Sequence, residues 1–83
     1  MKVRLRYFAS VREAIGRSTE ERDTQAATLG QLRTELAGLG EPYTQALASG
    51  KAVRLALDQV MADESAPLRD GCEVAFFPPV TGG

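Results

Sequence analysis

Apolar and polar residues alternate in two segments that lie far apart in the chain. In residues 2–7 the odd positions are apolar and the even positions are basic. A period of two is typical of a β-strand with one buried face, so this segment is predicted to be the first strand. Residues 53–57 show the same alternation and predict another strand, which we expect to continue after Asp58-Gln59 into Val60-Met61.

Two further strands are predicted from shorter patterns. Residues 73–77 form the last strand, with Val74 and Phe76 facing inward. Residues 18–24 are polar, and their position after a short break predicts a second strand that returns beside the first one. A turn over residues 67–71 precedes the last strand.

Apolar spacings of three and four residues mark the longest predicted helix. It begins at Thr28, which forms a capping-box pattern with Gln31, and it ends near Gly38 or Gly40. Its apolar face is formed by four leucines: Leu29, Leu32, Leu36 and Leu39.

Two shorter helices are expected on either side of this one in the sequence. Ser10 and Glu13 form the capping-box pattern of a first helix, which Gly16 would end. Residues 41–49 predict a short helix, because Pro42 suits a first helical turn.

The predicted order is strand, short helix, strand, long helix and then strands. Strands that cradle one main helix form an α+β roll, and this order and length fit a ubiquitin-like β-grasp. We therefore expect a mixed sheet packed on one main helix, with the last strand at its centre and an extended C-terminal tail. Residues 1–77 would form the β-grasp domain and residues 78–83 a flexible Gly-Gly tail, in a chain that is a single domain.

Composition and charge narrow the classes of partner. Apolar residues make up 43% of the 83 residues, which favours a packed core over disorder. The net charge is -1, and nucleic acid is not expected as a partner because phosphate binding needs a concentrated basic surface. Basic residues dominate residues 1–22 and acidic residues dominate residues 58–83. These runs are either ordinary solvated faces or, beside the tail, an acidic patch that meets a basic partner.

The cysteine count and the hydropathy of the chain indicate its compartment. Cys72 is the only cysteine, so no internal disulfide can form and a reducing compartment is expected. The N-terminal segment lacks the apolar stretch of a signal peptide, and no apolar run approaches the length of a membrane span. We expect a cytoplasmic protein without a membrane partner.

Candidate catalytic side chains are scarce. The sequence has no histidine, which is the usual general base near neutral pH, and with a single cysteine no metal site is expected. The adjacent carboxylates Asp63 and Glu64 are interpreted as solvated loop residues, and Cys72 as a packing residue. The chain is therefore expected to be a substrate or partner of other proteins rather than a catalyst by itself.

The C-terminal end carries the most distinctive chemistry. Pro78 and Pro79 have fixed φ angles and no amide hydrogens, so they end the last strand and favour an extended path. From Pro78 to Gly83 the tail could reach about 20 Å, which is enough to enter the active site of another protein. A Cβ at Gly83 would crowd attack on the terminal carbonyl, and one at Gly82 would widen the thread.

The terminal carboxylate of Gly83 is the candidate reacting group. A carboxylate is a poor electrophile because its charge and resonance repel nucleophiles. Adenylation by ATP would replace one oxide with a good leaving group. A sulfur nucleophile could then attack and leave a covalent C-terminal thiocarboxylate, whose sulfur can be passed on.

The terminal string resembles that of a known family. Residues 70–83, which end in Phe-Phe-Pro-Pro-Val-Thr-Gly-Gly, resemble the C-terminus of the molybdopterin synthase small subunits, the sulfur carriers of molybdenum cofactor biosynthesis. Weaker agreement covers residues 7–13, the helix near Thr28 and Gly50-Lys51. The chain departs from the family at residues 57–58, where Val-Asn is frequent, and at Cys72, where an acidic residue is common.

The resemblance implies a mechanism and a set of partners. An E1-like adenylyltransferase would use ATP to adenylate Gly83, and a sulfurtransferase would supply the sulfur of the thiocarboxylate, with no cofactor bound by this chain. The carrier would then insert its tail into the molybdopterin synthase large subunit and donate the sulfur to cyclic pyranopterin monophosphate. The family assembles from two small and two large subunits. The residues expected to thread into the partner site are Pro78, Pro79, Val80, Thr81 and Gly82.

Phe77 is the predicted anchor of partner docking. Aromatic residues commonly dominate interfaces, and alternation with Phe76 places the Phe77 side chain on the outer face of the last strand. The alternative is that Phe77 is simply a core residue.

Three other functions remain open from the residues alone. One is a sulfur carrier of the same fold that serves thiamine or cysteine synthesis, which would share the Gly-Gly end. Another is a ubiquitin-like modifier joined to lysines through Gly83, which would give stable isopeptide conjugates. The third is a binding module whose tail has no chemical role.

Overall fold

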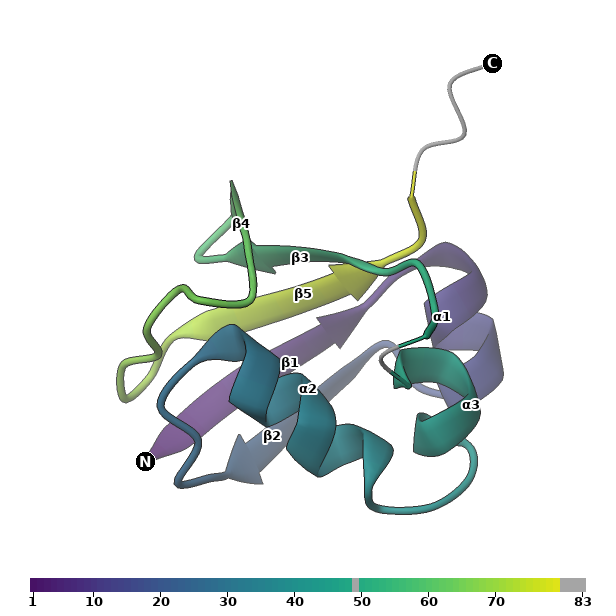
Figure 1. Cartoon of the computed structure of the whole chain (residues 1–83), viewed down its shortest axis with the longest axis horizontal. Coiled ribbons are helices and arrows are strands. Elements are labelled where there is room, and N and C mark those ends of the chain that lie inside the picture. Colours follow the sequence, from purple (N-terminus) through teal and green to yellow (C-terminus); the bar gives the residue numbers. More distant parts are fainter. Residues whose placement is uncertain (49, 80–83) are drawn as a thin grey trace.

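A five-stranded mixed sheet forms the centre of the protein, in a computed structural model that describes residues 1–48 and 50–79 (Figure 1). The strands are β1 (Lys2–Tyr7), β2 (Thr19–Asp23), β3 (Arg54–Leu57), β4 (Val60–Ala62) and β5 (Glu73–Phe77). The helices are α1 (Ala9–Ile15), α2 (Leu29–Ala37) and α3 (Tyr43–Leu47). Each predicted strand and helix is present, in the predicted order.

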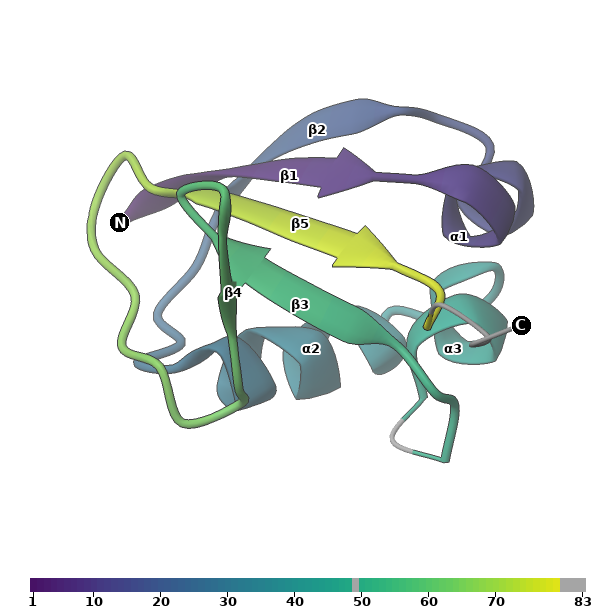
Figure 2. The same cartoon turned by 90° about the horizontal axis from the view of Figure 1, so that it is seen from above.

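The last strand lies at the centre of the sheet. The strands follow the order β2-β1-β5-β3-β4, in which β5 pairs in parallel with β1 and antiparallel with β3. The two outer pairs are antiparallel. Seen from above, β5 lies between β1 and β3 and ends on the side where α1 and α3 lie (Figure 2). The predicted α+β architecture, a mixed sheet with a central last strand, is confirmed.

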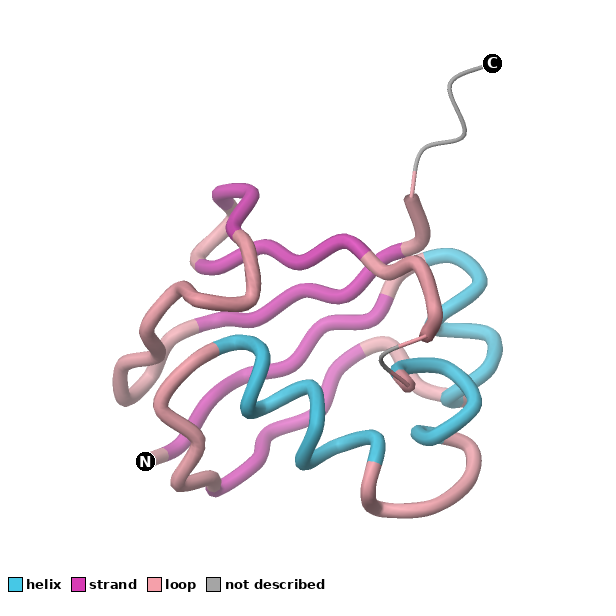
Figure 3. Tube along the Cα trace, in the orientation of Figure 1, coloured by secondary structure: helices cyan, strands magenta, loops and turns pink. Residues whose placement is uncertain are grey.

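One face of the sheet packs against the helices and forms the apolar core (Figure 3). Alternate residues of β1 and β5 point into this core, as their period of two predicts. Burying a large apolar side chain is worth about 1.5–3 kcal/mol, so the buried side chains of this core contribute much of the stability of the fold. The largest side chains with less than 2% exposure are Val3, Leu5, Tyr7, Leu29, Leu32, Leu36, Leu47, Val74 and Phe76.

The main helix, α2, begins as predicted but ends earlier than its leucine pattern suggests. The Thr28 hydroxyl accepts a hydrogen bond from the Gln31 amide at 3.2 Å and caps the helix. The helix ends at Ala37, and Gly38 is its C-terminal cap. Leu39 therefore leaves the helical period and is 48% exposed, so its predicted place on the buried face is wrong.

The capping box predicted for the first helix is also wrong. Phe8 precedes the first helical residue and has extended dihedral angles, so Ser10 already lies within the first turn of α1. No side chain caps this helix. The predicted end is confirmed: Gly16 adopts the left-handed conformation with φ of 89°, and its amide bonds to the Arg12 carbonyl at 2.8 Å.

β3 and β4 form a hairpin instead of one continuing strand. Asp58 and Gln59 both have positive φ, 49° and 70°, which is the geometry of a tight two-residue hairpin turn. The chain reverses there, and Leu57 faces Val60 across the ladder. The predicted strand at residues 60–61 is therefore present but runs back along β3.

Arg33 fixes the segment that follows α3. Its buried guanidinium donates hydrogen bonds to the carbonyls of Leu47 at 2.8 Å, Ala48 at 2.8 Å and Lys51 at 2.6 Å. It also forms an ion pair with Glu64 at 2.9 Å. α3 is shorter than predicted, because its C-terminal carbonyls bond to Arg33 rather than to a further helical turn.

A carboxylate holds α3 and β1 against β2. Glu20 accepts hydrogen bonds from the hydroxyls of Tyr7 and Tyr43, each 2.9 Å from its Oε1. Burial and the hydrogen bond to Glu20 raise the pKa of Tyr7 far above its ordinary value. The phenol therefore stays protonated and keeps donating to Glu20.

Candidate functional site at the end of β5

The C-terminal end of β5 is held on both sides by neighbouring strands. Tyr7 of β1 lies opposite Phe76, and Leu55 of β3 lies opposite the same residue on the other side. The Phe8 amide donates to the Phe76 carbonyl at 3.0 Å and extends the pairing by one residue. Because Phe76 is fully buried, the point at which the chain leaves the sheet is fixed by the core.

Pro78 and Pro79 follow directly and end the ladder. Neither has an amide hydrogen to donate to a neighbouring strand. Both are partly buried, so the first part of the predicted tail still contacts the domain. Val80, Thr81, Gly82 and Gly83 lie outside the described residues, and their threading and reacting roles stay predictions.

Phe77 points to the face of the sheet opposite the helices and is partly exposed. Its ring packs edge-on against the Phe8 ring, with centroids 6.0 Å apart and planes at 86°. The Arg6 guanidinium lies over the Phe8 ring, 5.0 Å from its centroid. The sequence-based placement of Phe77 on the outer side is thus observed, while its docking role stays a prediction.

The strand register places further apolar residues beside Phe77 on this open face. Ala75 of β5 lies opposite Ala56 of β3, and Ala56 lies opposite Met61 of β4. Met61 is 51% exposed and Phe8 is 37% exposed, whereas the small side chains of Ala56 and Ala75 are 5% and 6% exposed. We call this surface the docking face and define it by five residues: Phe8, Ala56, Met61, Ala75 and Phe77.

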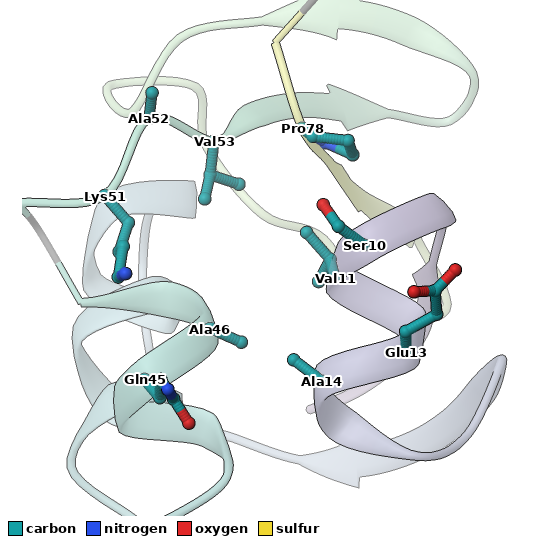
Figure 4. A pocket seen from close by; sticks show the side chains of 10 residues that line it. All are labelled: Ser10, Val11, Glu13, Ala14, Gln45, Ala46, Lys51, Ala52, Val53 and Pro78. Carbon is teal, nitrogen blue, oxygen red and sulfur yellow. The ribbon is translucent and has the colours of Figure 1, made fainter.

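A cleft of about 530 Å³, separate from the docking face, lies next to the base of the tail (Figure 4). Its walls come from α1, from α3 and from residues 51–53, which precede β3, and Pro78 lines it near the point where the tail leaves. The side chains of Val11, Ala14 and Val53 give it an apolar lining, with Lys51 toward one side. These side chains could hold an extended peptide, but they include no nucleophile paired with a base.

The other candidate groups have structural contacts. Cys72 is a buried core residue. Hydrogen bonds from the Ser65 hydroxyl and amide lower the pKa of Asp63, and Glu64 pairs with Arg33. In the described ranges, no group of three or more His, Cys, Asp or Glu residues could hold a metal ion. No helix of residues 1–48 and 50–79 is long and apolar enough to cross a membrane.

Sequence reasoning missed the part of the docking face that lies outside β5. Phe8 occupies the next even position after the basic residues of β1, so extending the alternation of residues 2–7 by one residue would have placed it on the open face. Met61 needed the hairpin at Asp58-Gln59, because only the reversal brings it beside Ala56.

Comparison with known proteins gives one family and a consistent set of relatives. The model of the ThiS family matches residues 5–83. A molybdopterin synthase sulfur carrier subunit from Escherichia coli K12 is 40% identical over 81 residues, which cover 98% of this chain and 99% of that protein.

Solved structures share the fold over the whole chain. SAMP1 from Haloferax volcanii superposes with a TM-score of 0.77 at 26% identity, covering 100% of both chains. A chain from the complex of subunits 1 and 2 of the molybdopterin-converting factor of Helicobacter pylori 26695 superposes with a TM-score of 0.66 at 28% identity, again covering 100% of both chains.

Proposed function

This chain belongs to the ThiS family, and from that premise we propose that it is the sulfur carrier subunit of molybdopterin synthase. The observation that carries the proposal is the position of β5. The strand is central, its last core residue is fully buried, and the chain leaves it through two prolines toward a Gly-Gly end. A rigid base with a slender end suits a substrate that must enter the active sites of other proteins.

The reacting group in this proposal is the terminal carboxylate of Gly83. An E1-like adenylyltransferase transfers AMP from ATP to one carboxylate oxygen and releases pyrophosphate. A persulfide sulfur of a sulfurtransferase then displaces AMP to give an acyl disulfide, and a thiol reduces this disulfide to release the thiocarboxylate. The thiocarboxylate attacks cyclic pyranopterin monophosphate, its C–S bond is cleaved by water, and the carboxylate of Gly83 is regenerated.

The partner that receives the tail is the large subunit of molybdopterin synthase, in an assembly of two small and two large subunits. The Helicobacter pylori relative, solved as a complex of subunits 1 and 2, supports a two-protein assembly. The docking face supports it as well, because exposed aromatic and methionine side chains beside the tail base are typical of a contact surface. The large subunit would supply the catalytic side chains, since the described residues that line the cleft beside the tail base include no nucleophile paired with a base.

The proposal is tested by intact-mass measurement. The protein is incubated with ATP, its cognate adenylyltransferase and a sulfur donor, and we expect the mass to rise by the difference between sulfur and oxygen, located at Gly83 by fragmentation. A variant that lacks Gly82-Gly83 is the matched control and should stay unchanged. Absence of exchange, under conditions in which the Escherichia coli carrier reacts, would contradict the proposal.

The sulfur acceptor is tested in a second step. Adding the large subunit and cyclic pyranopterin monophosphate to the thiocarboxylate form should yield molybdopterin and return the carrier to its original mass. If the thiocarboxylate forms but sulfur passes only to a thiamine or cysteine precursor, the chain is a sulfur carrier for another pathway.

A second candidate function is protein modification. The likeness to SAMP1, a small archaeal modifier protein, at 26% identity favours it. A modifier would form an isopeptide bond between Gly83 and lysine side chains. Immunoblots of cells that express the tagged protein distinguish the two: a ladder of conjugates that requires Gly83 indicates a modifier, and a single unconjugated band indicates a carrier.

A further inference from the structure

Two arginines flank the apolar docking face, and we propose that they make it selective for a partner that presents carboxylates opposite them. The inference rests on the proposed function, because it takes the docking face as the surface that meets the large subunit. It adds the chemistry of that partner's surface: an apolar depression for the aromatic pair, bordered by acidic side chains that face Arg6 and Arg54.

Arg6 borders the face on the β1 side. Its Nη1 lies 3.6 Å from Glu73 Oε2, which is an ion-pair distance but longer than a hydrogen bond. The guanidinium lies over the Phe8 ring, and the side chain remains 39% exposed. Within the described residues, the Arg6 side chain donates no hydrogen bond, so its N–H groups are available to a partner.

Arg54 borders the face on the β3 side. It lies directly opposite Phe77 in the antiparallel ladder, so its side chain shares the open face with that ring. Arg54 is exposed. Within residues 1–48 and 50–79 it forms none of the ion pairs and donates no side-chain hydrogen bond.

The strand order places the two charges on opposite sides of the aromatic pair. β1 and β3 are the two neighbours of β5 (Figure 2), and Arg6 lies beside Ala75 while Arg54 lies beside Phe77. Glu73 is the one carboxylate of the described residues within 4.0 Å of either guanidinium. The docking face therefore has an apolar centre, and Arg6, Arg54 and Glu73 together leave a net charge of +1 at its borders.

The cost of covering these arginines dictates what the partner must offer. A guanidinium has five N–H donors, and a buried charged group without acceptors is strongly unfavourable. A purely apolar partner surface would remove water from Arg6 and Arg54 and would offer no hydrogen-bond acceptors to replace it. Carboxylates opposite them would accept paired hydrogen bonds and would also attract the carrier over a distance.

The test measures binding to the recombinant large subunit from the same organism, at low and at moderate ionic strength. The variants are Arg6→Gln, Arg54→Gln and the double substitution. We expect each single variant to raise Kd about 3- to 10-fold at low salt, the double variant to raise it further, and the salt dependence of kon to become shallower with each lost charge. Arg54→Lys should retain most of the long-range attraction.

Two controls separate this chemistry from a general loss of charge or of fold. Arg69→Gln removes the same charge from an exposed residue that precedes β5, on the side away from the tail, and should change Kd less than 2-fold. Arg6→Gln combined with Glu73→Gln keeps the local charge balanced and should still bind more weakly than the natural chain. Melting temperatures of all variants verify that they fold.

The outcomes distinguish the inference from the function on which it rests. If Phe77→Ala weakens binding while Arg6→Gln and Arg54→Gln leave Kd within 2-fold at low salt, the face docks by apolar contact alone and the inference is wrong. If the natural chain forms the thiocarboxylate but none of these variants, Phe77→Ala included, affects binding, the docking face is misplaced and the inference again fails. If the natural chain neither reacts nor binds, the proposed function itself fails.

Discussion

Gly30 illustrates, at the scale of the residue, how closely the backbone segments of this small domain approach each other. It lies in the first turn of α2, and its amide donates to the Glu64 carbonyl at 2.9 Å. A Cβ on Gly30 would stand 2.9 Å from the Glu64 Cβ and 3.1 Å from its carbonyl oxygen. Glu64 also holds the Arg33 guanidinium, so its displacement would disturb a second contact.

We predict that Gly30→Ala destabilises the protein by about 1–3 kcal/mol, because the Glu64 backbone must move. The measurement is urea unfolding followed by circular dichroism. Gly50→Ala is the matched control: no atom lies within 4 Å of the position that a Cβ would take there, so stability should change by less than about 1 kcal/mol. Equal effects of the two substitutions would contradict the steric explanation.

At the scale of the element, Arg33 connects three segments. Its hydrogen bonds to the carbonyls of Leu47, Ala48 and Lys51 join α2 to the end of α3 and to the wall of the cleft beside the tail. Its side chain is 7% exposed, so these carbonyls would lose their partner away from bulk water if it were removed.

We predict that Arg33→Met lowers the free energy of unfolding by about 2–4 kcal/mol, through unsatisfied buried carbonyls. Hydrogen exchange should speed up most at the amides of α3 and of Lys51. Arg17→Met serves as the comparison. The Arg17 side chain is 56% exposed, so its ion pair with Glu20 should contribute less than about 1 kcal/mol.

Glu35 joins β2 to α2 and makes stability depend on pH. Burial opposes ionisation of its carboxylate, but hydrogen bonds from Thr24 at 2.7 Å and Arg22 at 2.5 Å outweigh it and hold the pKa of Glu35 below its ordinary value of 4.5. Because the pKa is lower in the folded state, this stabilisation is complete above the unfolded pKa. It is lost as the pH falls through the folded pKa.

We therefore predict that stability declines as the pH falls below about 5, and that Glu35→Gln makes this decline shallower. At neutral pH the variant should be about 1 kcal/mol less stable, because a neutral amide is a weaker partner for Arg22. Thermal unfolding from pH 7 to pH 3 measures both effects. A decline of unchanged steepness in the variant would show that other carboxylates cause it.

At the scale of the whole molecule, the residues that the fold requires and the residues expected to react occupy different parts of the C-terminal segment: β5 belongs to the sheet, and Gly83 follows it. Pairing of β5 with β1 and β3 joins the two ends of the chain, so the sheet cannot be complete without residues 73–77. Among the described residues, the core residues all lie before Pro78, and residues 80–83 are expected to act only on partners.

We predict that deletion of Gly82-Gly83 leaves the free energy of unfolding within about 0.5 kcal/mol of the natural value, while it abolishes thiocarboxylate formation. Deletion of residues 74–83 should instead prevent folding, because it removes the central strand. Circular dichroism and intact-mass measurement on the same samples check both statements. A marked loss of stability in the shorter deletion would show that the tail end packs on the domain.

The sequence by itself determined the elements and the chemistry of the terminus. Alternation in residues 2–7 and 73–77 predicted the two central strands and their inward side chains, because a period of two is a local property of extended backbone. The leucine spacing predicted α2, and the terminal string predicted the family, since each signal lies within one short segment of the sequence.

Only the tertiary structure decided where distant residues meet. The hairpin at Asp58-Gln59 depends on two positive φ angles in residues other than glycine, which no hydrophobic pattern reveals, and it brings Met61 into the docking face. Arg6 and Arg54 are separate charges in the sequence, and they become the two borders of one surface because β5 inserts between their strands. The chain thus encodes its reactive end locally, whereas pairing between strands distant in sequence builds the surface beside it.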